Sequence, residues 1–290
     1  MPILEKEEYV EQAYFFNALK ERIRENLATQ DVLAVVKQEI LATAKLSLAI
    51  DFLSSELRLH GIFGPGMARL RHYFTPFQAY LIEEAENERG RFEFDLALLI
   101  LEREAKYRAE GATPQGVFLY QFEVIAHNRL RYSRGMDAMQ GDPIFDTDWQ
   151  DFIKQFKTQI GLIEVSDMIY IYSQHYRQVQ QRQQKSCDDA PPMLFGEKEG
   201  KIALANRRRD PMLLFAALQR HLNYPQAPRP VKVSEEGAQL PALIKRLERL
   251  EMRLKLMEEE QKGGIDLERF YRQTQSKLPH PKEGEGDGER

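Results

Sequence analysis

Apolar residues recur three and four positions apart over most of residues 5–186 of this chain. In the first such stretch the spacing connects Phe16, Leu19, Ile23 and Leu27, which places all four on one face of an α-helix. Hydrophobic residues make up 42% of the sequence, which is enough to fill a core. The pattern predicts an all-α fold: a multi-helix bundle with long helices, followed by a proline-rich connector and a short C-terminal coiled-coil helix.

Glycine and proline residues divide the pattern into five expected helices. These helices cover about residues 5–27, 31–60, 75–108, 113–135 and 147–185. The second is apolar over a wide arc, which is typical of the central helix of a bundle. Gly90 and Gly161 mark points at which the third and the fifth helix can kink or break.

Two of the expected helices begin with a threonine followed by a proline. The side chains of Thr75 and Thr113 can each accept a hydrogen bond from a free N–H of the first turn, and proline suits the first helical position. After Thr75, Gln78 completes a capping box. We therefore expect the start at Thr75 to be the clearest helix start in the chain.

Composition divides the chain into four parts. We expect a helical bundle over residues 1–187, a linker over 188–237, the coiled-coil helix over 238–262, and a mostly disordered tail over 263–290. Within the linker, two short apolar stretches flank the residues Gly-Glu-Lys-Glu-Gly, a pattern that could form a small hairpin. Asp210 and Pro211 predict a short helix, and the prolines that follow it predict an extended segment.

The segment from Leu240 to Met257 has the pattern of a coiled coil. Six apolar residues alternate spacings of three and four, which is a heptad repeat. The a positions are Leu240, Leu247 and Leu254, and the d positions are Leu243, Leu250 and Met257. Because such a stripe needs a hydrophobic counterpart, the sequence predicts that this segment binds a protein partner.

Charged residues beside the stripe favour one orientation of that partner. Arg246 and Arg253 occupy g positions, and Glu251 and Glu258 occupy e positions. In a parallel homodimer each arginine faces a glutamate of the second helix, whereas in an antiparallel homodimer arginine faces arginine. Each exposed pair contributes only about 0.2–1 kcal/mol, so parallel pairing is favoured but not imposed.

The sequence does not decide which surface covers the leucine stripe. The segment spans about three heptads, which is short for a free-standing coiled coil. The leucines can be covered by the chain's own bundle, by a second copy of the chain in a homo-oligomer, or by a helix of another protein.

Glu123 and His127 are the candidates for a metal site, and they are better placed than Glu56 and His60, because His60 lies at a helix end. Glu123 and His127 are four positions apart and therefore share one face of the fourth expected helix. Di-iron bundles use glutamate and histidine three positions apart, so the spacing does not match, and a surface ion pair is the simpler interpretation. The single cysteine, Cys187, has no histidine near it in the sequence. We expect no catalytic residue and no cofactor.

The charge and cysteine content exclude several classes of protein. The formal net charge of −4 does not resemble that of a nucleic-acid binder. The most apolar stretch, residues 32–59, is interrupted by charged residues, and placing these in a bilayer would carry a large free-energy cost. A single cysteine and an acidic start with no apolar run after it favour the cytoplasm.

These observations predict a non-enzymatic helical scaffold or interaction protein. It would associate with itself or bind a partner through residues 240–257. The alternative is a metal-binding enzyme or carrier with a site inside the bundle near Glu123 and His127.

Overall fold

The computed structural model describes residues 4–25, 29–40, 43–87, 92–183 and 191–230. The described residues form thirteen α-helices, and their only extended pairings are two isolated bridges, Ile160 with Ile163 and Ser173 with Phe195. The predicted all-α class is therefore confirmed for this part of the chain. The predicted coiled-coil helix lies outside the described residues.

The helices have the following bounds: α1 Lys6–Arg24, α2 Thr29–Glu39, α3 Ala44–His60, α4 Gly64–Arg69, α5 Pro76–Ala85, α6 Phe94–Ala109, α7 Pro114–His127, α8 Tyr132–Gln140, α9 Thr147–Gln159, α10 Val165–Ile171, α11 Gln174–Arg182, α12 Glu197–Ala205 and α13 Pro211–Leu222.

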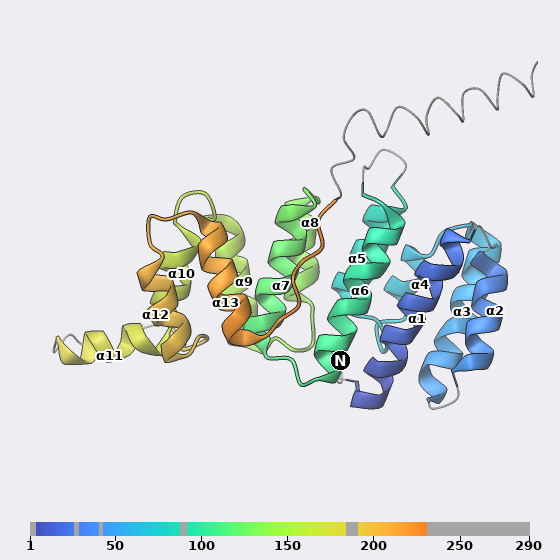
Figure 1. The fold of residues 1–290 in the computed structure, drawn as a ribbon, viewed down its shortest axis with the longest axis horizontal. Helices are drawn as coiled ribbons and strands as arrows, with labels where there is room; N and C mark the ends of the chain where they lie inside the picture. Colours follow the sequence, from blue (N-terminus) through green and yellow to red (C-terminus); the bar gives the residue numbers. More distant parts are fainter. Residues whose placement is uncertain (1–3, 26–28, 41–42, 88–91, 184–190, 231–290) are drawn as a thin grey trace, which may run out of the picture. The chain divides into compact units, whose positions relative to one another are not determined.

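All described helices belong to one compact unit, Met1–Pro230. Within it, α1 packs along α6 and also contacts α2 and α3, and α5 contacts α4, α6 and α8 (Figure 1). Helix α7 contacts α6, α8 and α13, and α12 lies against α10, α11 and α13. None of the described helices has both the length and the apolarity needed to cross a membrane.

The helix predicted over residues 31–60 is in fact two helices, α2 and α3. Thr43 has an extended backbone and precedes α3. Val36 of α2 and Ile50 of α3 are both buried, and Lys37 of α2 binds both carboxylate oxygens of Asp51 of α3 at 2.7 Å. The wide apolar arc in the sequence therefore belongs to two helices that pack side by side, not to one central helix.

The third predicted helix is also divided, into α5 and α6. Its start is confirmed, because Thr75 and Gln78 form the complete capping box. The chain then leaves the helix after Ala85, and the next residue, Glu86, accepts hydrogen bonds from the backbone N–H groups of Phe63 and Gly64. Glu86 thus caps the start of α4, a long-range contact that the local sequence does not contain.

The fourth and fifth predicted helices are shorter than expected. The predicted start at Thr113 is confirmed, but α7 ends at His127 and Arg129 adopts a left-handed backbone with φ of 53°. Gly135, the expected end, lies inside α8, where an added Cβ would be 2.7 Å from Ile125 of α7. The fifth predicted helix is broken at Gly161, with φ of 90°, and again at Ser173.

The linker that could have held a hairpin contains helices. Residues 197–205 form α12, so the hairpin expectation is wrong, whereas the short helix after Asp210 is confirmed as α13. Gly200 lies inside α12, where an added Cβ would be 2.2 Å from Oγ of Ser173. Its lack of a side chain allows α12 to approach the start of α11, and no turn requires it.

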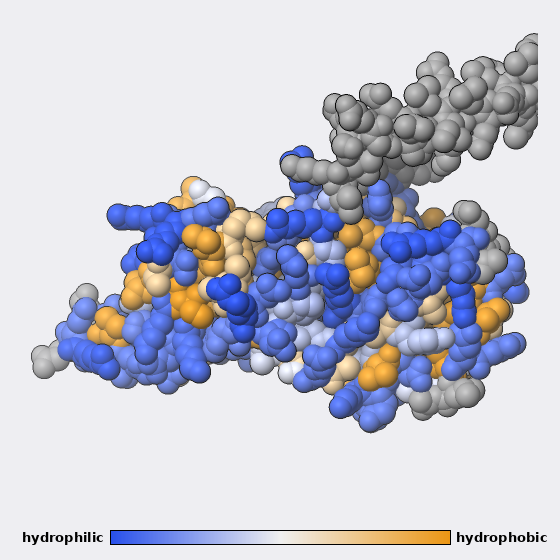
Figure 2. All heavy atoms as spheres, in the orientation of Figure 1, coloured by the Kyte–Doolittle hydropathy of each residue, from blue (hydrophilic) through white to orange (hydrophobic). Residues whose placement is uncertain are grey.

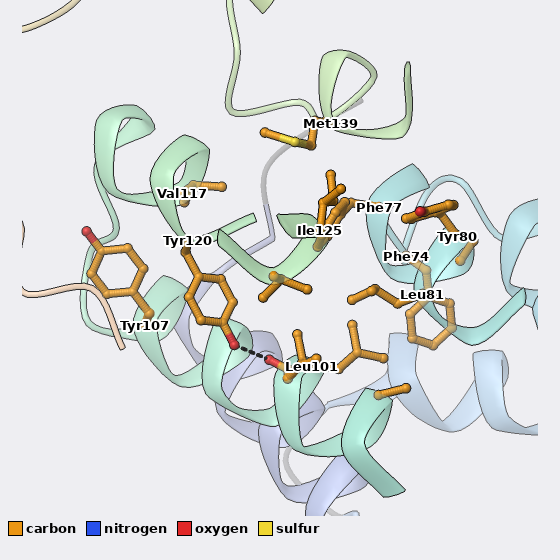
Figure 3. Packing of buried hydrophobic residues seen from close by; sticks show 14 of the residues in the cluster. Phe74, Phe77, Tyr80, Leu81, Leu101, Tyr107, Val117, Tyr120, Ile125 and Met139 are labelled. Carbon is orange, nitrogen blue, oxygen red and sulfur yellow. Dashed lines mark hydrogen bonds between the residues drawn. The ribbon is translucent and has the colours of Figure 1, made fainter. Parts of the chain in front are cut away.

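The core is rich in aromatic side chains. Phe118 of α7 contacts Phe152 and Phe156 of α9 edge to face, with ring centroids 5.3 and 5.2 Å apart. Tyr120, on the opposite side of α7, is fully buried, and its hydroxyl donates to the carbonyl of Ile100 in α6 over 2.8 Å (Figure 3). Helix α7 is therefore the central helix that the sequence placed at residues 31–60.

Candidate functional site

The predicted partner-binding residues lie outside the described residues. This holds for the heptad positions and for the four charged positions beside them: Leu240, Leu243, Leu247, Leu250, Leu254, Met257, Arg246, Glu251, Arg253 and Glu258. Their role stays a prediction.

Glu123 and His127 share one face of α7, as their spacing predicts, but the pair is not a surface ion pair. The side chains are only 9% and 15% exposed, and Nδ1 of His127 lies 3.9 Å from Oε2 of Glu123. The hydroxyl of Tyr224 lies 2.6 Å from Oε1 of Glu123. Nη2 of Arg229 lies 3.4 Å from Nε2 of His127. Residues that follow α13 therefore cover the pair.

The electrostatics of this pair do not suit a metal ion. Burial raises the pKa of Glu123, although the hydrogen bond from Tyr224 and the charge of Arg229 act against the rise. Burial and Arg229 lower the pKa of His127. Both shifts favour the neutral forms. Of these, only the neutral carboxyl group of Glu123 opposes metal binding, because a histidine binds a metal as the neutral imidazole. A guanidinium beside the histidine repels a cation, and no group of three histidine, cysteine, aspartate or glutamate residues suited to a metal occurs in the described chain.

Residues 224–230 form an extended strap over α6 and α7. Side chains of these helices donate to its backbone: Arg103 to the carbonyl of Gln226 over 2.8 Å, and Asn128 to the carbonyl of Pro228 over 3.1 Å. Two residues of the strap itself, Tyr224 and Ala227, are buried. Because three of the seven strap residues are prolines, the strap offers few N–H donors, and its carbonyls make these attachments.

A second charged cluster is buried between α6, α7 and the connection after α8. Nη2 of Arg108 lies 2.6 Å from Oε1 of Glu104 and 2.5 Å from Oδ2 of Asp142. Nε2 of Gln121 donates to the same two carboxylate oxygens over 3.0 and 3.2 Å. The side chains of Arg108, Glu104 and Asp142 are at most 2% exposed. The sequence contains only one sign of this cluster, the four-residue spacing of Glu104 and Arg108.

The buried cluster holds one more carboxylate than guanidinium. Burial raises the pKa of Glu104 against the opposing effect of Arg108. Oε2 of Glu104 and Oε1 of Gln121 both lack a hydrogen-bond partner, although the two side chains are already joined through their other polar atoms. The cluster is closed to solvent, so we assign it a structural role.

A cavity of about 550 Å³ opens where the α9–α10 turn faces the start of α13. Leu162, Ile163 and Leu214 supply apolar walls, and Arg208 and Arg209 lie at the same cavity. Figure 2 shows hydrophobic side chains exposed in this part of the surface, over α10, α12 and α13. Among the exposed large apolar residues of the described chain, Leu162 has the largest exposed fraction, 86%. Sequence reasoning missed this surface because its walls come from segments about 45 residues apart.

The comparisons with known proteins do not assign the chain to a group. It matches no protein-family model, no curated protein and no solved structure.

Proposed function

We propose that this protein is a non-enzymatic scaffold that associates with itself through residues 240–257. The observation that carries the proposal is the heptad repeat. Six apolar residues recur in one stripe, and charged residues at e and g complement each other in a parallel pair. Burying a leucine side chain contributes roughly 1.5–3 kcal/mol, so a seam of six such residues can offset the cost of association.

The described part of the chain supports this proposal in one respect. The strap fixes the chain up to Pro230 on α6 and α7, through Arg103 and Asn128. The segment with the heptads therefore starts from an anchored point, ten residues before Leu240. An anchored exit reduces the conformational freedom that association must remove.

The geometry around Glu123 does not favour the metal-binding alternative. Tyr224 contacts one carboxylate oxygen of Glu123, and the guanidinium of Arg229 lies against His127. The raised pKa of Glu123 weakens the pair further as a ligand set, because a carboxylate binds a metal in its ionised form.

Sedimentation equilibrium of the full chain and of a chain ending at Val233 tests the proposal. The shorter chain keeps the compact unit Met1–Pro230. We expect the full chain to sediment as an oligomer and the shorter chain as a monomer. Identical monomeric masses of the two chains at all concentrations would contradict self-association.

A matched pair of substitutions in the full chain separates the seam from the rest of the segment. Leu247→Asp places a charge at an a position, and Lys255→Asp places the same charge at a b position, away from the seam. We expect the first to dissociate the oligomer and the second to leave its mass unchanged.

A further inference from the structure

We infer that the surface around Leu162 is a second docking site, which takes an acidic peptide segment of a partner protein with at least one bulky apolar side chain. We name this surface the α10–α13 groove; it consists of Leu162, Ile163, Val165, Leu214, Arg208 and Arg209, which all line the cavity of about 550 Å³. It is separate from residues 240–257 and does not depend on self-association.

The first support is that Leu162 is held in an exposed position by an ordered turn. The N–H groups of Leu162 and Ile163 both donate to the carbonyl of Gln159 over 3.0 Å, and Gly161 supplies the left-handed backbone that the turn requires. The side chain is nevertheless 86% exposed. The fold thus forgoes the roughly 1.5–3 kcal/mol that burial of a leucine contributes.

The second support is that Leu162 has apolar neighbours around a concave surface. Ile163, beside it, is 36% exposed, and Val165 and Leu214 line the same cavity. Single exposed apolar residues are ordinary on protein surfaces, but adjacent ones at the mouth of an apolar-walled cavity of about 550 Å³ indicate a binding site. A concave surface suits an inserted side chain better than a flat bilayer, which would leave the cavity unfilled.

The third support is the charge at the groove. Arg207 is paired with Asp167 and lies over the ring of Tyr170. In contrast, no carboxylate of the described chain lies within ion-pair distance of the guanidinium of Arg208 or Arg209.

The nearby acidic groups are already engaged. Glu164 accepts hydrogen bonds from the backbone N–H of Arg208 and from Ser166, and Asp210 accepts one from the backbone N–H of Met212 at the start of α13. These donors are neutral, so Glu164 keeps its negative charge. The cavity lining carries two arginines, Arg208 and Arg209, against this one glutamate, and its net positive charge fits an acidic peptide.

The same charges argue against a second copy of this chain as the occupant. In a twofold symmetric pair each surface meets its own counterpart. Arg208 and Arg209 would then face the arginines of the second copy, which opposes association.

Selection of random short peptides displayed on phage tests this inference. The bait is the full chain, and the counter-selection uses the full-chain variant Leu162→Asp with Arg208→Glu and Arg209→Glu. All three side chains are exposed, so the variant keeps its core. We expect enriched peptides that combine acidic residues with leucine, phenylalanine or another bulky apolar residue. No enrichment over the variant, or enrichment of basic peptides, would overturn the inference.

The affinity of the most enriched peptide, measured by fluorescence anisotropy, then separates the contributions. We expect Leu162→Asp alone, and Arg208→Glu with Arg209→Glu, each to weaken binding at least tenfold. The matched controls, Leu48→Asp and Arg58→Glu on α3, also change exposed residues and should bind like the unchanged chain. Equal affinity in the groove variants and the controls would count against the inference.

Two further measurements distinguish the other occupants. Cosedimentation of the full chain with phosphatidylserine vesicles, lost in the groove variants, would assign the groove to a membrane instead. A change in the oligomeric mass of the full chain on Arg208→Glu with Arg209→Glu would assign it to a second copy. We expect neither result, whatever the sedimentation of the chain ending at Val233 shows.

Discussion

The hydroxyl of Tyr224 lies 2.6 Å from Oε1 of Glu123, although 101 positions separate the two residues. The same hydroxyl lies 3.2 Å from the carbonyl oxygen of Phe215. A hydroxyl has one proton and can donate to only one of these oxygens at a time. The hydroxyl therefore lies within hydrogen-bond distance of one acceptor on α7 and one on α13, and it holds the start of the strap to both helices.

Removing this hydroxyl tests the contact. We expect Tyr224→Phe to lower the free energy of unfolding by about 1–3 kcal/mol, because Glu123 and the carbonyl of Phe215 lose a buried partner. Urea denaturation gives the value. Tyr176→Phe on α11 is the control, since no hydrogen bond of its hydroxyl is found in the described chain. A change no larger than that of the control would show that the contact contributes nothing.

A substitution in the buried cluster around Arg108 should change the free energy of unfolding more strongly. Arg108→Met leaves the carboxylates of Glu104 and Asp142 buried without their cation, and we expect a loss of about 3–5 kcal/mol. Arg24→Met breaks an exposed ion pair with Asp95 and should lower the free energy of unfolding far less, because solvent screens that pair. Urea denaturation compares the two. Equal losses would contradict the assignment of Arg108 as the counter-ion of a buried pair.

The same cluster predicts how stability depends on pH. The pKa of Glu104 is raised in the folded state, so the folded protein keeps this proton over a pH range in which the unfolded chain has lost it. The stabilisation is complete below the unfolded value of about 4.3 and is lost as the pH rises through the folded pKa. Glutamine has the shape of a protonated glutamate but does not titrate. We therefore expect Glu104→Gln to reduce this loss of stability as the pH rises. Urea denaturation of the variant and the unchanged chain over a pH series checks it, and parallel curves would show that Glu104 does not titrate in this way.

Charge reversal tests the orientation of the heptad helices. In a parallel pair, Arg246→Glu with Arg253→Glu creates repulsion and should weaken association, and adding Glu251→Arg with Glu258→Arg should restore it. In an antiparallel pair like charges face each other before and after the exchange, so neither variant would differ from the unchanged chain. Sedimentation equilibrium of the full-length variants distinguishes the two orientations.

Sequence reasoning succeeded where structure depends on neighbouring residues. The starts at Thr75 and Thr113 were predictable, because a threonine side chain caps N–H groups only three residues away. A break of the third predicted helix was expected at Gly90, which lies between α5 and α6 in the sequence. The end of α5 at Ala85 was not predictable, because Glu86 caps α4, more than twenty residues earlier. Gly200 is a second example: its sequence context is typical of a turn, but in the fold it permits a close contact with the distant residue Ser173.

The candidate sites follow the same rule. The spacing of Glu123 and His127 correctly placed both residues on one face of a helix. The spacing could not reveal that the face is covered, because the cover is supplied by Tyr224 and Arg229. The exposed Leu162 was equally hidden, since a leucine after a glycine in an apolar stretch reads as core. Only the fold shows which apolar residues remain outside.

The strap has a mechanical consequence. Its carbonyls are attached to α6 and α7 by Arg103 and Asn128 at points beyond the end of α13. A force applied through the C-terminal residues therefore reaches the attachments on α7 and α6 before it reaches α13. A partner that pulls on the C-terminal segment would load the attachments on α7 and α6 first, and α13 would unravel only after these attachments had failed.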